Sequence, residues 1–286
     1  MTVFRPKLVF DAESPAPPSE PMKSLRTGLR VLLEFEKNQR DFGVTELAQR
    51  CDLSKSQVSK ILSALVDSGL LVQDPATRMY SVGQRCYVLG SRFTTYDSLC
   101  QAATPVMREL LKRSGHSVRL SVPDGDQSLY LIGLEGPMFM DTGWRSASSV
   151  PIGASSAGRV LMAHLDPERC RHMLELPVPE ITKHTVRNRA ALEKLVAAAR
   201  CDGYSIQRNE TSLGLGVVSV PLFKDGQQIV GALGLAFPSH HVAVGDEAAL
   251  IEALHDAARA ISQRLGCGVY PYGTGASRKA AGEADA

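Results

Sequence analysis

The stretch from Gly153 to Arg159 consists almost entirely of small residues and precedes a predicted helix. Backbone N–H groups at the start of a helix attract anions, and small side chains let a ligand carboxylate approach the backbone. Ser155, Ser156 and Ala157 are therefore candidate binding residues for an organic acid. The sequence leaves open the alternative that this stretch only caps the helix.

Two enzyme motifs resemble this stretch, and neither is complete. A phosphate-binding P-loop needs Lys followed by Ser or Thr after its second glycine, and the chain has Arg159 and Val160 there. A nucleophile elbow around Ser155 needs a glycine where the chain has Ala157. No catalytic residue is assigned, and a hydrolase that uses Ser155 is kept only as a rival interpretation.

Metal and thiol chemistry have weaker signals. His240 and His241 are adjacent without a third ligand at a suitable spacing, so we expect them on the surface and without a metal. The six cysteines include no CxxC pair, which predicts neither a zinc site nor a disulfide framework. A thiol-based redox regulator that uses Cys86 or Cys100 is an alternative function. No cofactor is predicted.

A second set of candidate residues lies on one face of a predicted helix within residues 54–68. Hydroxyl, amide and ammonium groups near a helix N-terminus can reach base edges and phosphates in a DNA groove. An ordinary solvated helix face would have a similar composition. The candidate DNA-binding residues of this helix are Lys55, Ser56, Gln57, Ser59 and Lys60.

Local signals make this helix the second of a helix-turn-helix pair. Residues 44–51 carry apolar side chains at helical spacing. After a short turn, Ser54 and Gln57 have the spacing of a capping box, and Gly69 supplies the left-handed residue that ends the second helix. The spacing therefore predicts two short helices joined by a tight turn.

Two β runs, residues 70–73 and 79–82, follow this helix and predict a two-stranded wing. Arg78 at the tip of the wing could enter a minor groove or contact a phosphate. A further helix precedes the pair, with Arg26 near its start as another DNA-binding candidate. That helix is expected to close the small core through Leu25, Leu29, Leu32 and Leu33.

The composition of the whole chain limits its class. Its 286 residues, 44% hydrophobic and 22% charged, are typical of a globular protein with two domains. A net charge of +2 excludes a general polyanion binder, so affinity for DNA requires a local basic patch. Neither a membrane-spanning run nor a signal peptide is recognisable, which predicts a cytoplasmic protein.

The second half of the chain mixes strands and helices. Its hairpins predict an α+β fold with helices on one face of a sheet and a ligand pocket on the other. Arg119 lies on the polar side of the first strand, either as a solvated edge residue or as a counter-ion for a bound acid. Trp144, the only tryptophan, lies in a loop-rich passage over residues 138–150. Pro105 is expected to kink or break the helix before this region.

Several motifs in a fixed order resemble one protein family. They are Lys23-Ser24-Leu25, Tyr80-Ser81-Val82-Gly83, Tyr87-Val88-Leu89-Gly90, Pro151 to Leu161, Gly203-Tyr204, Glu210, Gly214 and Val220-Pro221-Leu222-Phe223. Together they resemble the isocitrate-lyase-regulator (IclR) family of bacterial transcription factors. The resemblance implies an N-terminal winged helix-turn-helix domain, a linker helix and a C-terminal GAF-like domain that binds a small metabolite. Members form homodimers and often dimers of dimers.

We therefore expect an ordered series of segments. They are a disordered arm (1–21), a winged helix-turn-helix DNA-binding domain (22–83), a linker helix (84–102), a GAF-like effector-binding domain (103–267) and a disordered tail (268–286). The expected partners are double-stranded operator DNA, a small organic acid and further copies of the chain, without a membrane. The operator sequence, the identity of the effector and the direction of regulation are not encoded in any motif.

The resemblance also implies effector-binding residues. In relatives that sense small keto acids, the loop matching Ser155, Ser156 and Ala157 holds the ligand together with four polar positions. Those positions carry Gln207 in place of an acid, and Val217, Gly234 and Ala236 in place of a thiol or hydroxyls. We therefore hypothesise a larger, partly apolar effector such as an aromatic acid, whose carboxylate meets Ser156 or Arg119. Trp144 completes the set of candidates.

Overall fold

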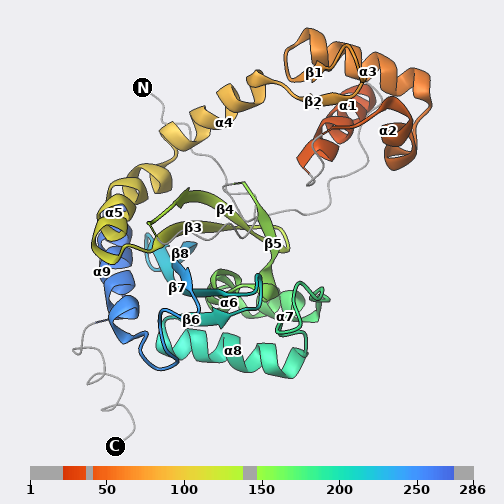
Figure 1. The fold of residues 1–286 in the computed structure, drawn as a ribbon. Coiled ribbons are helices and arrows are strands. Elements are labelled where there is room, and N and C mark those ends of the chain that lie inside the picture. Colours follow the sequence, from red (N-terminus) through yellow and green to blue (C-terminus); the bar gives the residue numbers. More distant parts are fainter. Residues whose placement is uncertain (1–21, 37–40, 138–146, 274–286) are drawn as a thin grey trace, which may run out of the picture. The chain divides into compact units, whose positions relative to one another are not determined.

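We describe the protein from a computed structural model, which covers residues 22–36, 41–137 and 147–273 in describable detail (Figure 1). The chain divides into two compact units, Met1–Asp97 and Ser98–Ala286. The arm expected over residues 1–21 lies outside the described residues. None of the helices in the described part is long and apolar enough to cross a membrane.

The first unit is a small helical domain with a two-stranded ribbon. Its elements are α1 (Lys23–Leu33), the 3₁₀ helix η2 (Glu34–Glu36), α2 (Val44–Cys51), α3 (Lys55–Asp67), β1 (Leu71–Gln73), β2 (Tyr80–Val82) and α4 (Gln84–Tyr96). The strands β1 and β2 pair antiparallel, with Leu71 opposite Val82. These elements confirm the predicted helix-turn-helix and wing.

The turn between α2 and α3 forms for local reasons. Asp52 has a left-handed backbone with φ of 52° and ends α2. Ser54 caps α3, because its Oγ accepts a hydrogen bond from the Gln57 backbone N–H at 3.2 Å while Gln57 Oε1 accepts from the Ser54 N–H at 3.1 Å. Val58 and Leu62 on the inner face of α3 are fully buried. The predicted capping box therefore fixes where the second helix begins.

The predicted inner face of α1 is wrong for three of its four leucines. Leu25, Leu29 and Leu33 are 54%, 47% and 50% exposed, whereas Val31 is fully buried and Phe35 nearly so. Val31 and the four leucines are all apolar, and helical periodicity does not tell which of them the core will use. The exposed stripe is therefore left on the surface of this unit.

The helix α4 buries none of its residues. Asp97 has an extended backbone with ψ of 130° and separates α4 from α5 (Ser98–Ser114). The linker expected over residues 84–102 thus spans α4 and the start of α5, and α5 belongs to the second unit, where Leu99 is buried. The helix α5 also continues through Pro105 without a break.

The second unit is built around one antiparallel sheet. Its remaining elements are β3 (Ser117–Asp124), β4 (Gln127–Leu134), β5 (Ser149–Pro151), η3 (Ile152–Ala154), α6 (Ser156–Ala163), α7 (Pro167–Glu175), α8 (Arg189–Asp202), β6 (Ser205–Arg208), β7 (Leu215–Lys224), β8 (Gln228–Pro238) and α9 (Ala248–Arg264). The strand order is β5-β4-β3-β8-β7-β6, and each neighbouring pair is antiparallel. The predicted α+β class and the β3–β4 and β7–β8 hairpins are confirmed.

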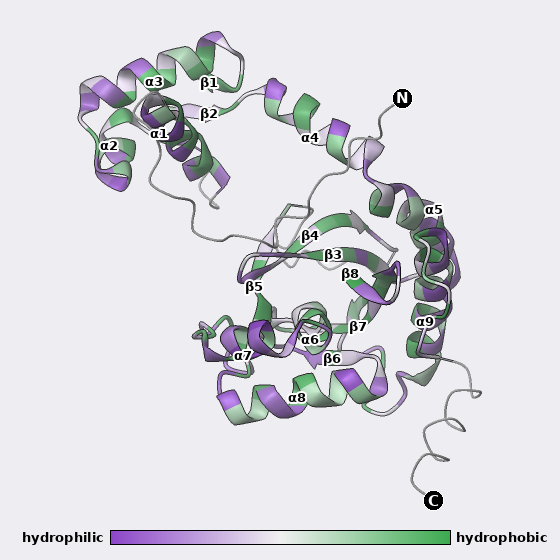
Figure 2. Cartoon of the chain, turned by 180° about the vertical axis from the view of Figure 1, so that it is seen from behind, coloured by the Kyte–Doolittle hydropathy of each residue, from purple (hydrophilic) through white to green (hydrophobic). Residues whose placement is uncertain are grey.

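Helices cover both faces of the sheet, not one face as expected (Figure 1). On one face lie α5 and α9, with Leu99 Cδ2 only 3.5 Å from the position a Cβ of Gly231 would take. On the other face lies α6, every residue of which is buried. The helix α8 alternates between hydrophilic and hydrophobic residues in Figure 2, as expected of a helix with one solvated face. Because the candidate residues Ser155, Ser156 and Ala157 lie at the start of α6, we expect the ligand on the sheet face that α6 covers.

The chain after α9 also differs from expectation, because part of the predicted disordered tail packs on the second unit. Tyr270 is 7% exposed, and its hydroxyl donates to the Pro221 carbonyl at 3.1 Å. The Tyr272 hydroxyl donates to the Arg200 carbonyl at 2.8 Å and lies 2.8 Å from His164 Nε2. Residues 268–273 are thus part of the folded unit, and residues 274–286 lie outside the described residues.

Candidate functional site

The candidate residues of α3 lie on its exposed face. Val58 and Leu62 point into the core of the unit, which leaves the opposite side of the helix free for a ligand. Arg26 at the start of α1 and Arg78 in the wing are exposed as well. The exposed candidates of α3 are Lys55, Ser56, Gln57, Ser59 and Lys60.

Gln57 takes part in the cap of α3 as well as lying on its exposed face. Its Oε1 accepts hydrogen bonds from the Ser54 N–H at 3.1 Å and from the Ser54 hydroxyl at 3.0 Å. Because the carbonyl oxygen is engaged in the cap, a base contact by Gln57 would use its amide NH₂ group. Gln57 is therefore expected to recognise a base only by donating a hydrogen bond.

Asp74 organises the tip of the wing. Its Oδ1 accepts hydrogen bonds from the backbone N–H groups of Ala76 at 2.7 Å and Thr77 at 3.0 Å. These bonds lower the pKa of the Asp74 carboxyl below its usual value of 3.8. Arg78 follows with a left-handed φ of 60°, which directs the chain back into β2. The wing therefore presents an exposed guanidinium from an ordered turn.

The sheet register brings the second set of candidates together. Gln207 lies opposite Val217, and Val217 lies opposite Ala236. Arg119 lies opposite Gly234 in a neighbouring row. Side chains at directly opposed positions point to the same face of a sheet. The five strand candidates, which come from β3, β6, β7 and β8, therefore share one face.

The start of α6 lies on this same face. Ser219 is opposite Gly234, and its Oγ is 2.9 Å from Ser156 Oγ. Ser155 caps α6, because its Oγ accepts a hydrogen bond from the Gly158 N–H at 3.0 Å. The hydroxyl of Ser155 is thus used in the cap, as the alternative interpretation predicted, and a role as an activated nucleophile has no support. Ala157 is buried beside these serines.

Gly158, the second glycine of the incomplete P-loop motif, has a packing role. A Cβ at this position would lie 1.7 Å from the carbonyl oxygen of Ile152. Only glycine allows α6 to approach the preceding η3 so closely. A pocket lies nearby between Asp126, Gly153 and Met173, and none of the predicted effector residues lines it.

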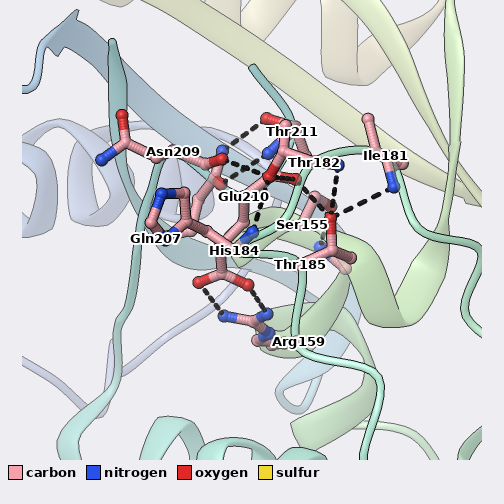
Figure 3. Close-up of polar contacts among 11 residues, drawn as sticks. Ser155, Arg159, Ile181, Thr182, His184, Thr185, Gln207, Asn209, Glu210 and Thr211 are labelled. Carbon is pink, nitrogen blue, oxygen red and sulfur yellow. Dashed lines mark hydrogen bonds and ion pairs between the residues drawn. The ribbon is translucent and has the colours of Figure 1, made fainter. Parts of the chain in front are cut away.

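Figure 3 shows a buried ion pair that the sequence analysis missed. Arg159 of α6 is fully buried and forms a two-pronged pair with Glu210, with Nη1 and Oε1 3.1 Å apart and Nη2 contacting Oε2. The hydroxyls of Thr182 and Thr185 donate to the Glu210 carbonyl at 3.3 and 2.8 Å. The sequence did hold a signal for this pair, because Arg159 is the one charged residue of α6.

The side chain of Gln207 is tied to the turn after β6 (Figure 3). It is 2% exposed, and its Nε2 donates to Thr211 Oγ1 at 2.7 Å while its Oε1 accepts from the Thr211 N–H at 3.2 Å. Thr211 was also missed, because the contact bridges a strand and a loop. Gln207 therefore holds the loop that carries Glu210.

Arg119 is not a solvated edge residue. It lies on the inner strand β3, is 8% exposed, and pairs with Glu135 through Nη1–Oε1 and Nη2–Oε2 contacts of 3.1 and 3.3 Å. Its guanidinium carbon lies 6.0 Å from the centre of the Tyr130 ring. Burial raises the pKa of Tyr130 to about 12. Trp144, the remaining candidate, lies outside the described residues.

The thiol and histidine candidates have unfavourable surroundings. Cys100 is fully buried, and burial raises the pKa of the Cys86 thiol. Both properties oppose reaction as a thiolate. His240 and His241 are exposed, and the described residues include no cluster of three possible metal ligands. A redox or metal function has no structural support here.

Comparisons with known proteins match both units. A family model described as the IclR helix-turn-helix domain matches residues 24–75, and one described as the bacterial transcriptional regulator IclR C-terminal matches residues 93–263. The HTH-type transcriptional regulator KdgR of Escherichia coli (strain K12) is 27% identical over 242 residues, which are 84% of this chain and 92% of KdgR.

Solved structures share the fold. The IclR transcriptional regulator from Alicyclobacillus acidocaldarius has a TM-score of 0.77 at 21% identity, covering 85% of this chain and 99% of that chain. An IclR homologue from Microbacterium hydrocarbonoxydans, complexed with 4-hydroxybenzoate, has a TM-score of 0.72 at 24% identity, covering 85% of this chain and 98% of its own. The folds of both units therefore recur in known proteins.

Proposed function

The chain belongs to the IclR family of bacterial transcriptional regulators, and from that premise we propose how it recognises DNA and its effector. As in the family, a helix-turn-helix domain precedes a ligand-binding C-terminal domain, and the protein is a regulator, not an enzyme. We assign DNA binding to residues 22–83 and effector binding to residues 103–267. The finer assignments below extend this family function.

We infer that α3 lies in the major groove of an operator. The observation that carries this inference is the outward face of α3, where hydroxyls, an amide and two lysines lie opposite the buried Val58 and Leu62. Arg26 and Arg78 are exposed and would contact phosphates or a minor groove. A regulator of this kind contacts bases through α3 and the backbone through its flanks.

Selection of bound sequences from random oligonucleotides tests this proposal. The full-length protein should enrich a near-palindromic operator. Lys60→Ala should lower affinity for all sequences and reduce the slope of log affinity against log salt by about 1, because it removes a phosphate contact. Lys194→Ala, which removes an exposed lysine on α8, is the matched control and should change neither. Failure to enrich any sequence would contradict the proposal.

A second pair of variants isolates base recognition by Gln57. Gln57→Ala should relax the preference at one operator position by about 1–3 kcal/mol. It also removes the cap partner of Ser54, so Ser54→Ala serves as the control, since it disturbs the cap and leaves the Gln57 amide in place. Equal relaxation in both variants would assign the effect to the cap.

The proposed effector is an aromatic acid. Val217, Gly234 and Ala236 offer apolar or absent side chains on the face of the sheet under α6, and Arg119 and Ser219 lie opposite Gly234 on the same face. A relative of the same fold was solved with 4-hydroxybenzoate. Calorimetry with benzoate, 4-hydroxybenzoate, glyoxylate and pyruvate tests this proposal. Binding of the two keto acids alone would contradict an aromatic effector.

We further propose that a second copy of the chain covers the exposed apolar faces of the first unit. Leu25, Leu29 and Leu33 form one stripe on α1. The helix α4 exposes large apolar residues, namely Tyr87, Val88, Leu89, Phe93 and Tyr96. Exposed stripes of this kind are typical of helices that associate with another chain.

The oligomeric state tests the dimer. In analytical ultracentrifugation, the combined change Leu29→Glu and Phe93→Glu should lower the mass toward that of a monomer. Val244→Glu, at an 85% exposed apolar position of the second unit, is the control and should leave the mass unchanged. An unchanged mass in the double variant would place the interface elsewhere.

A further inference from the structure

Arg119 lies in a row of residues with little side-chain bulk. Across the sheet it is opposite Gly133 on β4 and opposite Gly234 on β8, and Gly234 is in turn opposite Ser219 on β7. Neighbouring strands are about 4.8 Å apart, so the backbones of β3 and β7 are about 10 Å apart across Gly234. The row therefore carries little side-chain bulk beside Arg119, and the Ser219 hydroxyl lies over Gly234, 3.1 Å from the position that a Cβ of Gly234 would take.

The two members of the Arg119–Glu135 pair differ in exposure. The Arg119 side chain is 9% exposed, whereas the Glu135 side chain is 39% exposed. Glu135 follows the last residue of β4, and the next residue, Gly136, donates its N–H to Ser117 Oγ at 3.1 Å. The Glu135 carboxylate thus pairs with Arg119 from the end of β4 and remains partly exposed to water.

This asymmetry decides which partner can leave. A buried guanidinium without any hydrogen-bond acceptor is strongly unfavourable, because its charge has lost water and its N–H groups have lost every partner. A half-exposed carboxylate regains water when it moves away, at little cost. Arg119 therefore needs an acceptor beside it, and that acceptor can be the Glu135 carboxylate or the carboxylate of a ligand.

The surroundings of Arg119 favour an acid with a flat body. Its guanidinium carbon is 6.0 Å from the Tyr130 ring centre, and Tyr130 belongs to an apolar cluster with Val150 and Ala154. Ala154 immediately precedes the Ser155 cap of α6. A planar guanidinium binds a carboxylate through two parallel hydrogen bonds. The site thus combines a two-pronged donor with apolar walls.

We propose that Glu135 is an internal substitute for the effector carboxylate: a carboxylate ligand displaces Glu135 from Arg119 and releases the end of β4. This inference rests on the proposed function, since it assumes that the C-terminal domain binds an organic acid. Under this proposal, the free and ligand-bound states differ in the Arg119–Glu135 contact. Glu135 pairs with Arg119 in the free protein and is solvated in the bound protein.

Calorimetry on the full-length protein and its Glu135→Gln variant tests the exchange. The probes are benzoate, 4-hydroxybenzoate and pyruvate, with benzamide as an uncharged analogue of benzoate. Glu135→Gln should bind the carboxylates about three- to tenfold more tightly than the unmodified protein, because the competing charge is gone. Its affinity for benzamide should not change. Arg119→Lys keeps the charge but loses the two-pronged geometry, and should weaken carboxylate binding about fivefold.

Glu180→Gln is the matched control. It also removes one exposed carboxylate that pairs with an arginine, Arg187, at the surface of the same unit. It should leave all affinities unchanged. Tighter binding in Glu180→Gln would assign the gain to net charge and overturn the exchange, as would unchanged carboxylate affinity in Glu135→Gln.

The same experiment separates this inference from the aromatic effector. If only pyruvate binds, the aromatic proposal fails, and the affinity ratio of Glu135→Gln for pyruvate still decides the exchange. If benzamide and benzoate gain equally in Glu135→Gln, the exchange is overturned while an aromatic ligand stands. If no carboxylate binds to either protein, the exchange is overturned, and the operator selection remains the separate test of DNA binding.

Discussion

The two units place their polar groups in opposite positions. Among the described residues before Ser98, the buried side chains are apolar apart from the Tyr80 hydroxyl, and the charged, amide and serine groups of α3 face outward. The second unit buries two arginines, two glutamates, two histidines and many hydroxyls, most of them at or near the sheet face under α6. The proposed DNA-binding residues therefore lie on a surface, whereas the proposed effector-binding residues lie within a core.

This difference determines how mutations should act in each unit. An exposed lysine of α3 can be removed without altering the packing below it, so binding and stability are separable there. Ser156, Gln207 and Arg159 are each buried and hydrogen-bonded. A substitution at any of these three residues therefore also alters the stability of the second unit.

The largest effect is expected from breaking the buried pair of the second unit. Arg159→Met leaves the Glu210 carboxylate buried without its counter-ion and should lower the free energy of unfolding by about 3–5 kcal/mol. Lys60→Met in the first unit should change it by less than about 0.5 kcal/mol. Hydrogen exchange read separately in α6 and in α3 measures both.

A double variant keeps this comparison informative even where Arg159→Met fails to fold. Arg159→Met with Glu210→Leu replaces the pair by apolar side chains and should recover most of the loss. Arg187→Met, which breaks the exposed Arg187–Glu180 pair, should cost less than about 1 kcal/mol. A loss in Arg187→Met as large as in Arg159→Met would remove the distinction between buried and exposed pairs.

The next effect concerns pH, because all seven histidines lie from His116 onward. Burial lowers the pKa of His255 from 6.5 to about 4, and the charge of Arg259 lowers it while that of Asp256 opposes this. The unfolded chain therefore takes up a proton at a higher pH than the folded chain does. Stability from this group is complete above about pH 6.5 and declines as the pH falls toward 4, by up to about 3 kcal/mol.

The two units should thus respond differently to acid. Exchange protection in β7 and β8 should fall between pH 6.5 and 4, and His255→Gln should reduce that fall. Burial also lowers the pKa of His164 and His116, so a smaller decline should remain in the variant. In the first unit, the lowered pKa of Asp74 acts only below 3.8, and protection in α3 should stay level. An equal decline in α3 would contradict the assignment to histidines.

The sequence predicted the first unit well because its signals are local. The capping box of Ser54 and Gln57, the turn at Asp52 and the β1–β2 wing each depend on residues within a few positions of one another. The failure on α1 has a different origin, since Leu29 and Val31 are equally apolar and only the tertiary core selects between them. Periodicity predicts that a helix has an apolar stripe, and packing decides which stripe is used.

The second unit was predicted in its elements but not in its contacts. Its strands other than β5 and the cap at Ser155 were found, and the register placed the resemblance-derived candidates on one face. The Arg159–Glu210 pair joins residues 51 positions apart, and the Tyr272–His164 contact joins residues 108 apart. No local pattern encodes partners at such separations, so both pairs needed the folded structure.

A moderate effect is expected at the helix cap of the first unit. Ser54→Ala removes the acceptor of the Gln57 N–H and should lower the stability of the helix-turn-helix by about 1 kcal/mol. Exchange protection should fall in α2 and α3 and stay unchanged in β7 and β8. Ser68→Ala, at the other end of α3, is the control, because its hydroxyl bonds only the Leu65 carbonyl in the last turn. A loss in Ser68→Ala as large as in Ser54→Ala would show that the cap has no special role.

The smallest effect should come from Glu135→Gln, which compares two Arg–Glu pairs within one unit. Glu135 is half-exposed, and the amide oxygen introduced by the substitution can still accept a hydrogen bond from Arg119, so the free energy of unfolding should change by less than about 1 kcal/mol. Glu210→Gln removes the charge of a buried partner whose backbone carbonyl is also held by Thr182 and Thr185, and should cost several-fold more. Urea unfolding of the full-length variants measures both. If the two glutamates prove equally costly to neutralise, Glu135 is a structural partner of Arg119, and a ligand carboxylate could not displace it at low cost.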